Sequence, residues 1–136
     1  GIRFAGEASL NFVGGGAWTN ALFYSETKGT LTVGDGVKKG EVFFDWGAGW
    51  GGDIVLNGGK FGCDSADGVN KDGATRVTIT NGGKLIVPAG VTLALADVTV
   101  DGKALKGGTY SGESWLEGAG SVKVTPTRKG LRIMMK

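Results

Sequence analysis

The sequence predicts an all-β fold, a parallel β-solenoid that ends in a C-terminal hairpin cap. An apolar motif recurs at a spacing of about 23 residues, and a glycine-containing corner follows each copy. Glycine is abundant and proline rare, with 28 Gly against 2 Pro, while the hydrophobic content of 40% argues against a disordered chain. We therefore expect a single domain over residues 1–136.

The repeat consists of four apolar-polar-apolar triplets. Such a triplet is typical of a short strand with one buried face, and the Asn-Gly or Asp-Gly that follows supplies the positive φ of a tight corner. One unit buries too little apolar surface to fold alone, so the units should stack and align the first and third triplet residues in two columns. The triplets are Leu31-Thr32-Val33, Ile54-Val55-Leu56, Val77-Thr78-Ile79 and Val98-Thr99-Val100. Gly58, Gly82 and Gly102 are the corner residues expected at positive φ.

The remaining segments are assigned in chain order. Residues 1–29 fit the repeat poorly and are expected to be irregular, although Leu10 lies 23 residues before Val33 and residues 17–25 are compatible with an aromatic-bearing strand. Residues 30–100 hold the repeats. After the Asn-Gly-Gly corners, Phe61 in one coil and Leu85-Ile86-Val87 in another should begin a second face.

Residues 101–136 are predicted to form the cap and a tail. The triplet Val98–Val100, the corner Asp101-Gly102 and the following Lys103–Leu105 give the signal of an antiparallel hairpin. A further strand is expected over Ser121–Thr125. The chain should therefore leave the repeat pattern after residue 100.

The segment Leu85–Val124 resembles the C-terminal ends of large secreted bacterial β-helix proteins, similar to autotransporter-type passengers and their associated β-strand repeats. The stretches that carry the resemblance are Leu95–Leu105, Gly108–Ser111 and Leu116–Val124, and it covers about a third of the chain well. It implies a right-handed parallel β-solenoid (β-helix) of about 23-residue coils with a C-terminal hairpin cap, placed outside the cell or at the cell surface of a bacterium. It also implies an adhesive or structural role. The ending Gly130–Lys136 departs from the pattern.

Composition excludes several function classes. Histidine is absent, which removes every mechanism that needs an imidazole base or a His metal ligand. Cys63 is the only cysteine, so there is no internal disulfide or Cys-rich zinc site, and we expect it to be a small buried side chain. The basic residues within 128–136 outweigh the whole formal charge of +2, so the body is not a nucleic-acid binder. No apolar run is long enough for a membrane helix, and no cofactor is expected.

Two indoles in a glycine-rich stretch are the first candidate for ligand binding. Trp46 and Trp50, beside Asp45 and Asp53, are typical of a carbohydrate-binding surface, where flat aromatic faces lie next to carboxylates. The alternative is that both indoles cover an open edge or fill a wide coil, as aromatics do in other β-repeat folds. Glycans are therefore a candidate partner class.

Carboxylates give weaker candidates. The acidic stretch holding Asp64, Asp67 and Asp72 is calcium-like in composition, but its spacing does not match an EF-hand, so we expect a solvated loop and no metal. Asp97 with Asp101, or Glu113 with Glu117, would have to lie in one cleft to run glycoside hydrolysis. Asp101 is better explained by its Asp-Gly turn.

The C-terminal residues alternate apolar and basic side chains. Leu131 and Ile133 can face an apolar groove while Arg132 faces water, so this segment is predicted to dock on a neighbouring copy, with capping of its own chain or a disordered tail as alternatives. The leading hypothesis is a noncatalytic extracellular structural protein, the building block of a surface layer, stalk or filament that self-associates through β-edges or end to end. The alternatives are a glycan-binding adhesion module and, third, a fragment of a polysaccharide-active β-helix enzyme.

Overall fold

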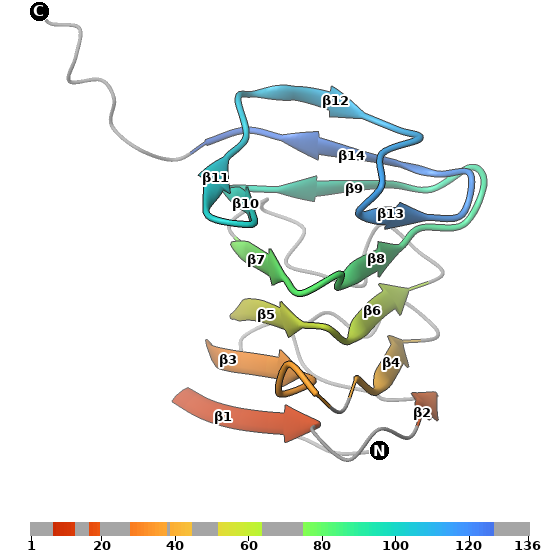
Figure 1. Ribbon diagram of the computed structural model, residues 1–136. Helices are drawn as coiled ribbons and strands as arrows, with labels where there is room; N and C mark the ends of the chain where they lie inside the picture. Colours follow the sequence, from red (N-terminus) through yellow and green to blue (C-terminus); the bar gives the residue numbers. More distant parts are fainter. Residues whose placement is uncertain are drawn as a thin grey trace, which may run out of the picture.

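The computed structural model describes residues 7–12, 17–19, 28–37, 39–44, 52–63 and 75–126. Over these residues the chain is all-β without a helix, as predicted, and its strands form three sheets (Figure 1). The strands are β1 (Glu7–Phe12), β2 (Ala17–Thr19), β3 (Lys28–Val33), β4 (Glu41–Phe44), β5 (Asp53–Asn57), β6 (Lys60–Cys63), β7 (Val77–Thr80), β8 (Lys84–Ile86), β9 (Thr92–Leu95), β10 (Val98–Val100), β11 (Lys103–Ala104), β12 (Gly108–Tyr110), β13 (Leu116–Glu117) and β14 (Ser121–Val124).

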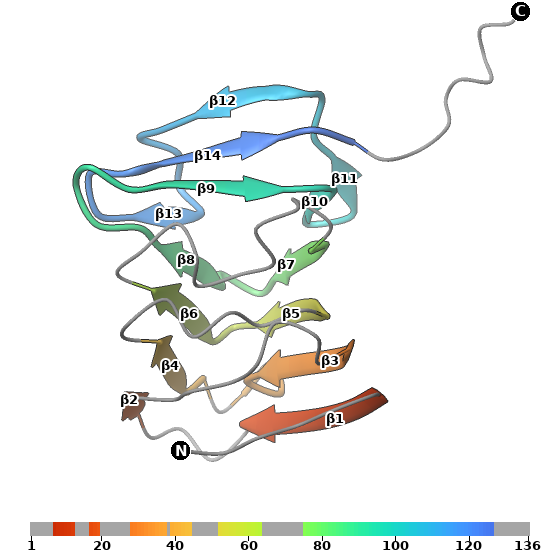
Figure 2. The same ribbon diagram turned by 180° about the vertical axis from the view of Figure 1, so that it is seen from behind.

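Consecutive strands alternate between two parallel stacks. The first sheet has the order β1-β3-β5-β7-β10-β11, and the second has the order β13-β8-β6-β4-β2. Every neighbouring pair in these two sheets is parallel except β10 with β11. Figure 1 and the view from behind in Figure 2 show the levels rising from β1 and β2 to the cap. The two stacks thus climb together, one level per pair of strands.

The predicted register of the triplets is confirmed. Leu31 pairs with Ile54, Ile54 with Val77 and Val77 with Val98, which forms the first column. The third triplet residues pair in the same way and form the second column, Val33, Leu56, Ile79 and Val100. All of these side chains are buried except Val100, which is partly buried against the core. Each added level therefore extends a continuous apolar interior.

The second face starts where the sequence placed it, and it supplies further columns. Phe61 pairs with Val42 on one side and with Leu85 on the other, and Leu85 pairs with Leu116. These four side chains are buried. In the third sheet, β14 runs parallel to β9 and pairs the buried residues of both strands, Leu93 with Val122 and Leu95 with Val124. The core is thus closed by side chains from all three sheets.

The corners adopt the backbone that their residues predict. Gly58, Gly82 and Gly102 have φ of 85°, 79° and 83°, which confirms the expectation for all three. Asn81 and Asp101 also have positive φ, 54° and 52°, so both central residues of these two turns are left-handed. That is the two-residue turn for which Asn-Gly and Asp-Gly are preferred.

Two expectations for the N-terminal segment are wrong for the residues described there. The sequence predicts irregular structure over residues 1–29, but β1 and β2 join the two stacks as their outermost strands. Leu10 pairs with Leu31 and Phe12 with Val33, two residues away from the alignment of Leu10 with Val33. The register follows the apolar alternation of the strands, because the number of residues between levels is free to vary. Of the strand considered for residues 17–25, the structure describes Ala17–Thr19.

The predicted cap is present. Val100 pairs with Lys103 and Thr99 with Ala104 in an antiparallel hairpin, and β14 confirms the strand expected near the end. β12 runs antiparallel to β14. Trp115 is only 6% exposed and packs on Tyr110, with ring centroids 5.9 Å apart at 57°. These two aromatic rings add to the core from the last level of the chain.

Candidate functional site

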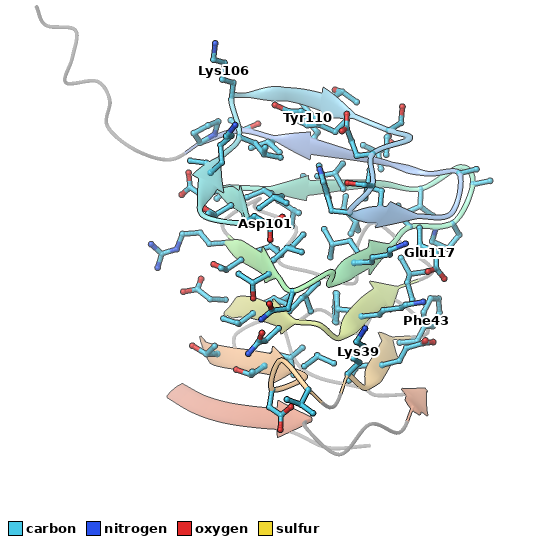
Figure 3. All side chains as sticks on the ribbon, in the orientation of Figure 1. Lys39, Phe43, Asp101, Lys106, Tyr110 and Glu117 are labelled. Atoms are coloured by element: carbon cyan, nitrogen blue, oxygen red, sulfur yellow. The ribbon has the colours of Figure 1, made fainter. Side chains whose placement is uncertain are left out.

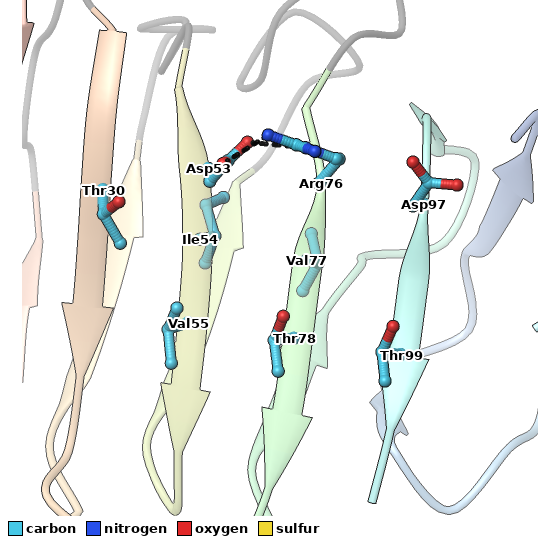
Figure 4. Close-up of a pocket in the computed structure, with 9 residues that line it drawn as sticks. All are labelled: Thr30, Asp53, Ile54, Val55, Arg76, Val77, Thr78, Asp97 and Thr99. Carbon is cyan, nitrogen blue, oxygen red and sulfur yellow. Dashed lines mark hydrogen bonds and ion pairs between the residues drawn. The ribbon is translucent and has the colours of Figure 1, made fainter. Parts of the chain in front are cut away.

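The outer face of the first sheet carries a polar hollow. Because side chains alternate along a strand, burial of the triplet columns turns the intervening residues outward on β3, β5, β7 and β10. They surround an open space of about 450 Å³ (Figure 4). Its lining residues are Thr30, Asp53, Ile54, Val55, Arg76, Val77, Thr78, Asp97 and Thr99. We call this space the outer hollow.

Charged and hydroxyl groups occupy two parallel rows in the outer hollow. Asp53, Arg76 and Asp97 lie on successive strands in one row, each directly before the first residue of its triplet. Thr78 and Thr99 pair with each other in the second row, beside Val55 (Figure 4). The rows therefore present carboxylates, a guanidinium and hydroxyls at the spacing of neighbouring strands, roughly 4.8 Å.

Arg76 and Asp53 form the ion pair of the outer hollow. Arg76 Nη2 donates to Asp53 Oδ2 at 3.1 Å and Nε donates to Oδ1 at 3.4 Å, a two-pronged geometry. The side chains are 61% and 39% exposed, so solvent screens the pair and its contribution to stability is small. The pair holds the guanidinium between two strands and leaves it accessible to a ligand.

The structure places one of the four predicted glycan-contacting residues in the outer hollow. Asp53 lies there, paired with Arg76. Asp45, Trp46 and Trp50 lie outside the described residues. So do the residues predicted for assembly and those of the acidic loop, which are Leu131, Arg132, Ile133, Asp64, Asp67 and Asp72.

The carboxylate pairs considered for hydrolysis are separated in role. Asp101 forms the turn of the β10–β11 hairpin, and its backbone N–H donates to Ile79 O at 2.9 Å. Asp97 lines the outer hollow instead. Glu117 accepts a hydrogen bond from Lys60 Nζ at 2.8 Å, whereas Glu113 is exposed and lies in the segment before β13. Figure 3 labels Asp101 and Glu117 on different sheets.

The Lys60–Glu117 ion pair is a feature that sequence reasoning missed. It joins β6 to β13 across 57 residues of chain. The hydrogen bond from Lys60 lowers the pKa of Glu117, and the same contact raises the pKa of Lys60. Both side chains are more than a third exposed, so this pair also contributes little to stability.

Asparagine side chains form a second polar row at the corners. Asn57 Oδ1 accepts hydrogen bonds from Thr80 Oγ1, at 3.2 Å, and from Asn81 Nδ2. Backbone bonds run the same way, from Gly36 N to Asn57 O and from Gly58 N to Thr80 O, both at 2.9 Å. These contacts tie successive levels together where the chain turns from the first sheet into the second.

Comparison with protein-family models, with curated proteins and with solved structures gives no significant match. Over the part of the chain that the structure describes, no three His, Cys, Asp or Glu side chains gather as a metal site. The same residues include no helix of the length and apolarity that a membrane crossing needs.

Proposed function

We propose that this chain is a noncatalytic structural unit, a right-handed parallel β-solenoid that self-associates through its N-terminal edge as part of an extracellular stalk, filament or surface layer of a bacterium. The observation that carries the proposal is the difference between the two ends of the strand stacks. A right-handed path agrees with the strong preference of parallel β crossovers. The extracellular bacterial setting comes from the resemblance of residues 85–124.

The C-terminal end is protected against further pairing. β11 folds back antiparallel on β10, and the short β12 is the outer strand of the third sheet. The two residues of β11 are exposed and one of them, Lys103, is charged. Short, charged edge strands are a common way to prevent edge-to-edge association. The cap therefore favours termination of a stack at this end.

The N-terminal end has the opposite character. Among the described strands, β1 and β2 each pair on one side only, with β3 and β4. β1 is six residues long and continues the register of the stack above it. The N–H and C=O groups along its free edge are a template for another strand, and we assign that place to a second copy of the chain.

The test is the association state of the purified chain, by sedimentation and electron microscopy, over a range of concentrations. Ser9→Lys with Asn11→Lys places two ammonium groups on β1, and the matched control, Thr78→Lys with Thr99→Lys, places them on central strands. We expect the wild type and the control to associate and the β1 variant to stay monomeric. A wild type that remains monomeric throughout, or a control that dissociates as fully as the β1 variant, would overturn the proposal.

The outer hollow favours a second function, recognition of a glycan. Sugar hydroxyls form hydrogen bonds with carboxylates, guanidinium groups and hydroxyls, the groups that line this space. If so, Arg76→Ala should abolish binding on a glycan array, while Lys123→Ala, on the exposed face of β14, should leave it unchanged. Trp46→Ala tests the indole surface in the same assay. Equal binding by wild type and Arg76→Ala would exclude the outer hollow as the glycan site.

A further inference from the structure

Two corners of this fold share the local sequence Asn-Gly-Gly-Lys, at residues 57–60 and 81–84. Asparagine followed by glycine is the pair most prone to lose its side-chain amide, because glycine has no Cβ to hinder attack by its own backbone nitrogen. With identical residues downstream, the two sites have closely similar intrinsic reactivity. Any difference between them in the folded protein comes from the structure.

Asn57 is held in place at both reacting groups. Its Oδ1 accepts two hydrogen bonds, from Thr80 Oγ1 and from Asn81 Nδ2. The nitrogen that would attack it, Gly58 N, donates to Thr80 O at 2.9 Å, and Gly58 is buried. Reaction at Asn57 thus requires the corner to break contacts with the next level of the stack.

Asn81 lies in the same kind of corner with far fewer restraints. Asn81 and Gly82 are both exposed, and a Cβ built on Gly82 would meet no atom within 4 Å. Gly82 N donates no hydrogen bond to another described residue, since the turn is closed by Gly83 N donating to Thr80 O at 3.0 Å. Rotation of the Asn81–Gly82 peptide therefore disturbs one turn bond and the side-chain contact to Asn57.

We propose that Asn81 is a selective site of spontaneous deamidation in the folded protein, and that Asn57 is protected. Hydroxide removes the proton of Gly82 N, and this nitrogen attacks Cγ of Asn81. The Cγ–Nδ2 bond breaks, and Nδ2 leaves as ammonia after taking up a proton. Water then opens the five-membered imide at either carbonyl, which gives aspartate or isoaspartate at position 81.

The product changes the corner where successive levels meet. A carboxylate replaces the amide that donates to Asn57 Oδ1, so two acceptors face each other. The isoaspartate form also adds a methylene to the main chain of a two-residue turn, whose geometry depends on its length. Both products should weaken the link between β5–β6 and β7–β8. This inference is independent of the proposed self-association.

Trypsin separates the two sites cleanly. Cleavage after Lys39 and Lys60 releases one peptide that contains Asn57, and cleavage after Arg76 and Lys84 releases another that contains Asn81. The intact protein is incubated in mildly alkaline buffer, digested, and the fraction of each peptide that has exchanged ammonia for water is measured by mass spectrometry. A parallel sample is incubated in urea, where the fold no longer protects either site.

In the folded sample we expect Asn81 to react about tenfold faster than Asn57, since reaction at Asn57 must first break the additional hydrogen bond of Gly58 N. In urea the two rates should become equal within about a factor of two, because the local sequences match. Equal rates in the folded protein, faster reaction at Asn57, or a folded protein in which neither site reacts while both react in urea would overturn the proposal.

Discussion

A single methyl group at Gly59 provides a sharp test of how closely the levels approach one another. Gly59 follows the corner between β5 and β6, and its φ lies outside the left-handed region, so alanine fits its backbone conformation. A Cβ built there would nevertheless lie 2.5 Å from Val33 O and 2.5 Å from Val33 Cγ1, and closer still to Lys39 O. Two of these atoms belong to the backbone of the neighbouring level, which cannot avoid the methyl by changing a rotamer. Overpacking of this kind costs about 3 kcal/mol, the upper part of its usual range.

The control is Gly82→Ala. Its Cβ meets nothing within 4 Å, but φ is 79°, so only the left-handed backbone is penalised, by about 1 kcal/mol. Urea unfolding followed by circular dichroism measures both variants. We expect Gly59→Ala to lose about 3 kcal/mol or to fail to fold, with a clearly smaller loss for Gly82→Ala. If Gly59→Ala loses no more stability than the control, the levels do not approach as closely as the structure has them.

Three further predictions concern the core and the ion pairs. Val77→Asp should abolish folding, because an unpaired carboxylate would enter a fully packed column, while Thr78→Ala on the outer face of the same strand should change stability by about 0.5 kcal/mol or less; far-UV circular dichroism that shows a folded Val77→Asp protein would contradict this. Leu56→Ala should lose about 3 kcal/mol in urea unfolding, and a loss below about 1 kcal/mol would show that this side chain is not enclosed. Glu117→Gln should lose about 0.5 kcal/mol near neutral pH. The lowered pKa of Glu117 means that this difference is lost as the pH falls below 4.5, and the raised pKa of Lys60 means that it is lost as the pH rises beyond 10.5, so melting curves that differ equally at acidic and neutral pH would refute the role of the pair.

The register was predictable because its signal is local and repeated. Each triplet indicates a strand by its own alternation, and the recurrence at a fixed spacing states which residues pair. Leu31, Ile54 and Val77 can thus be aligned from the sequence alone. The corner glycines follow from the same reasoning, since Asn-Gly and Asp-Gly have few other roles at the end of a strand.

The N-terminal levels were not predictable from the repeat because their spacing differs. Leu10 pairs with Leu31, and the sequence signal that identifies this pairing is the alternation of Leu10 and Phe12 against Leu31 and Val33. A fixed count of 23 residues fails there because the connection between levels is shorter. The burial pattern, which selects the face of a strand, is the stronger constraint on register.

The polar contacts divide into one that the repeat contained and one that it did not. Asp53 and Arg76 are 23 residues apart, the same spacing as the columns, so their pairing on the outer face could have been deduced. Lys60 and Glu117 are 57 residues apart and meet because the chain leaves the second sheet, builds the hairpin and returns as β13. No local pattern encodes that return.

The central claim is that successive levels stack in parallel and in register, and nuclear Overhauser effects between outward-facing methyl groups test it most directly. On the solvent side of the first sheet, Val55 pairs with Thr78 and Thr78 with Thr99. Methyl-labelled protein should therefore show cross-peaks from Thr78 to both Val55 and Thr99. Because these groups face water, packing in the core cannot produce the cross-peaks by another route. Cross-peaks that instead join Thr78 to residues one position along β5 or β10, or an absence of any contact between these strands, would contradict the stacked arrangement.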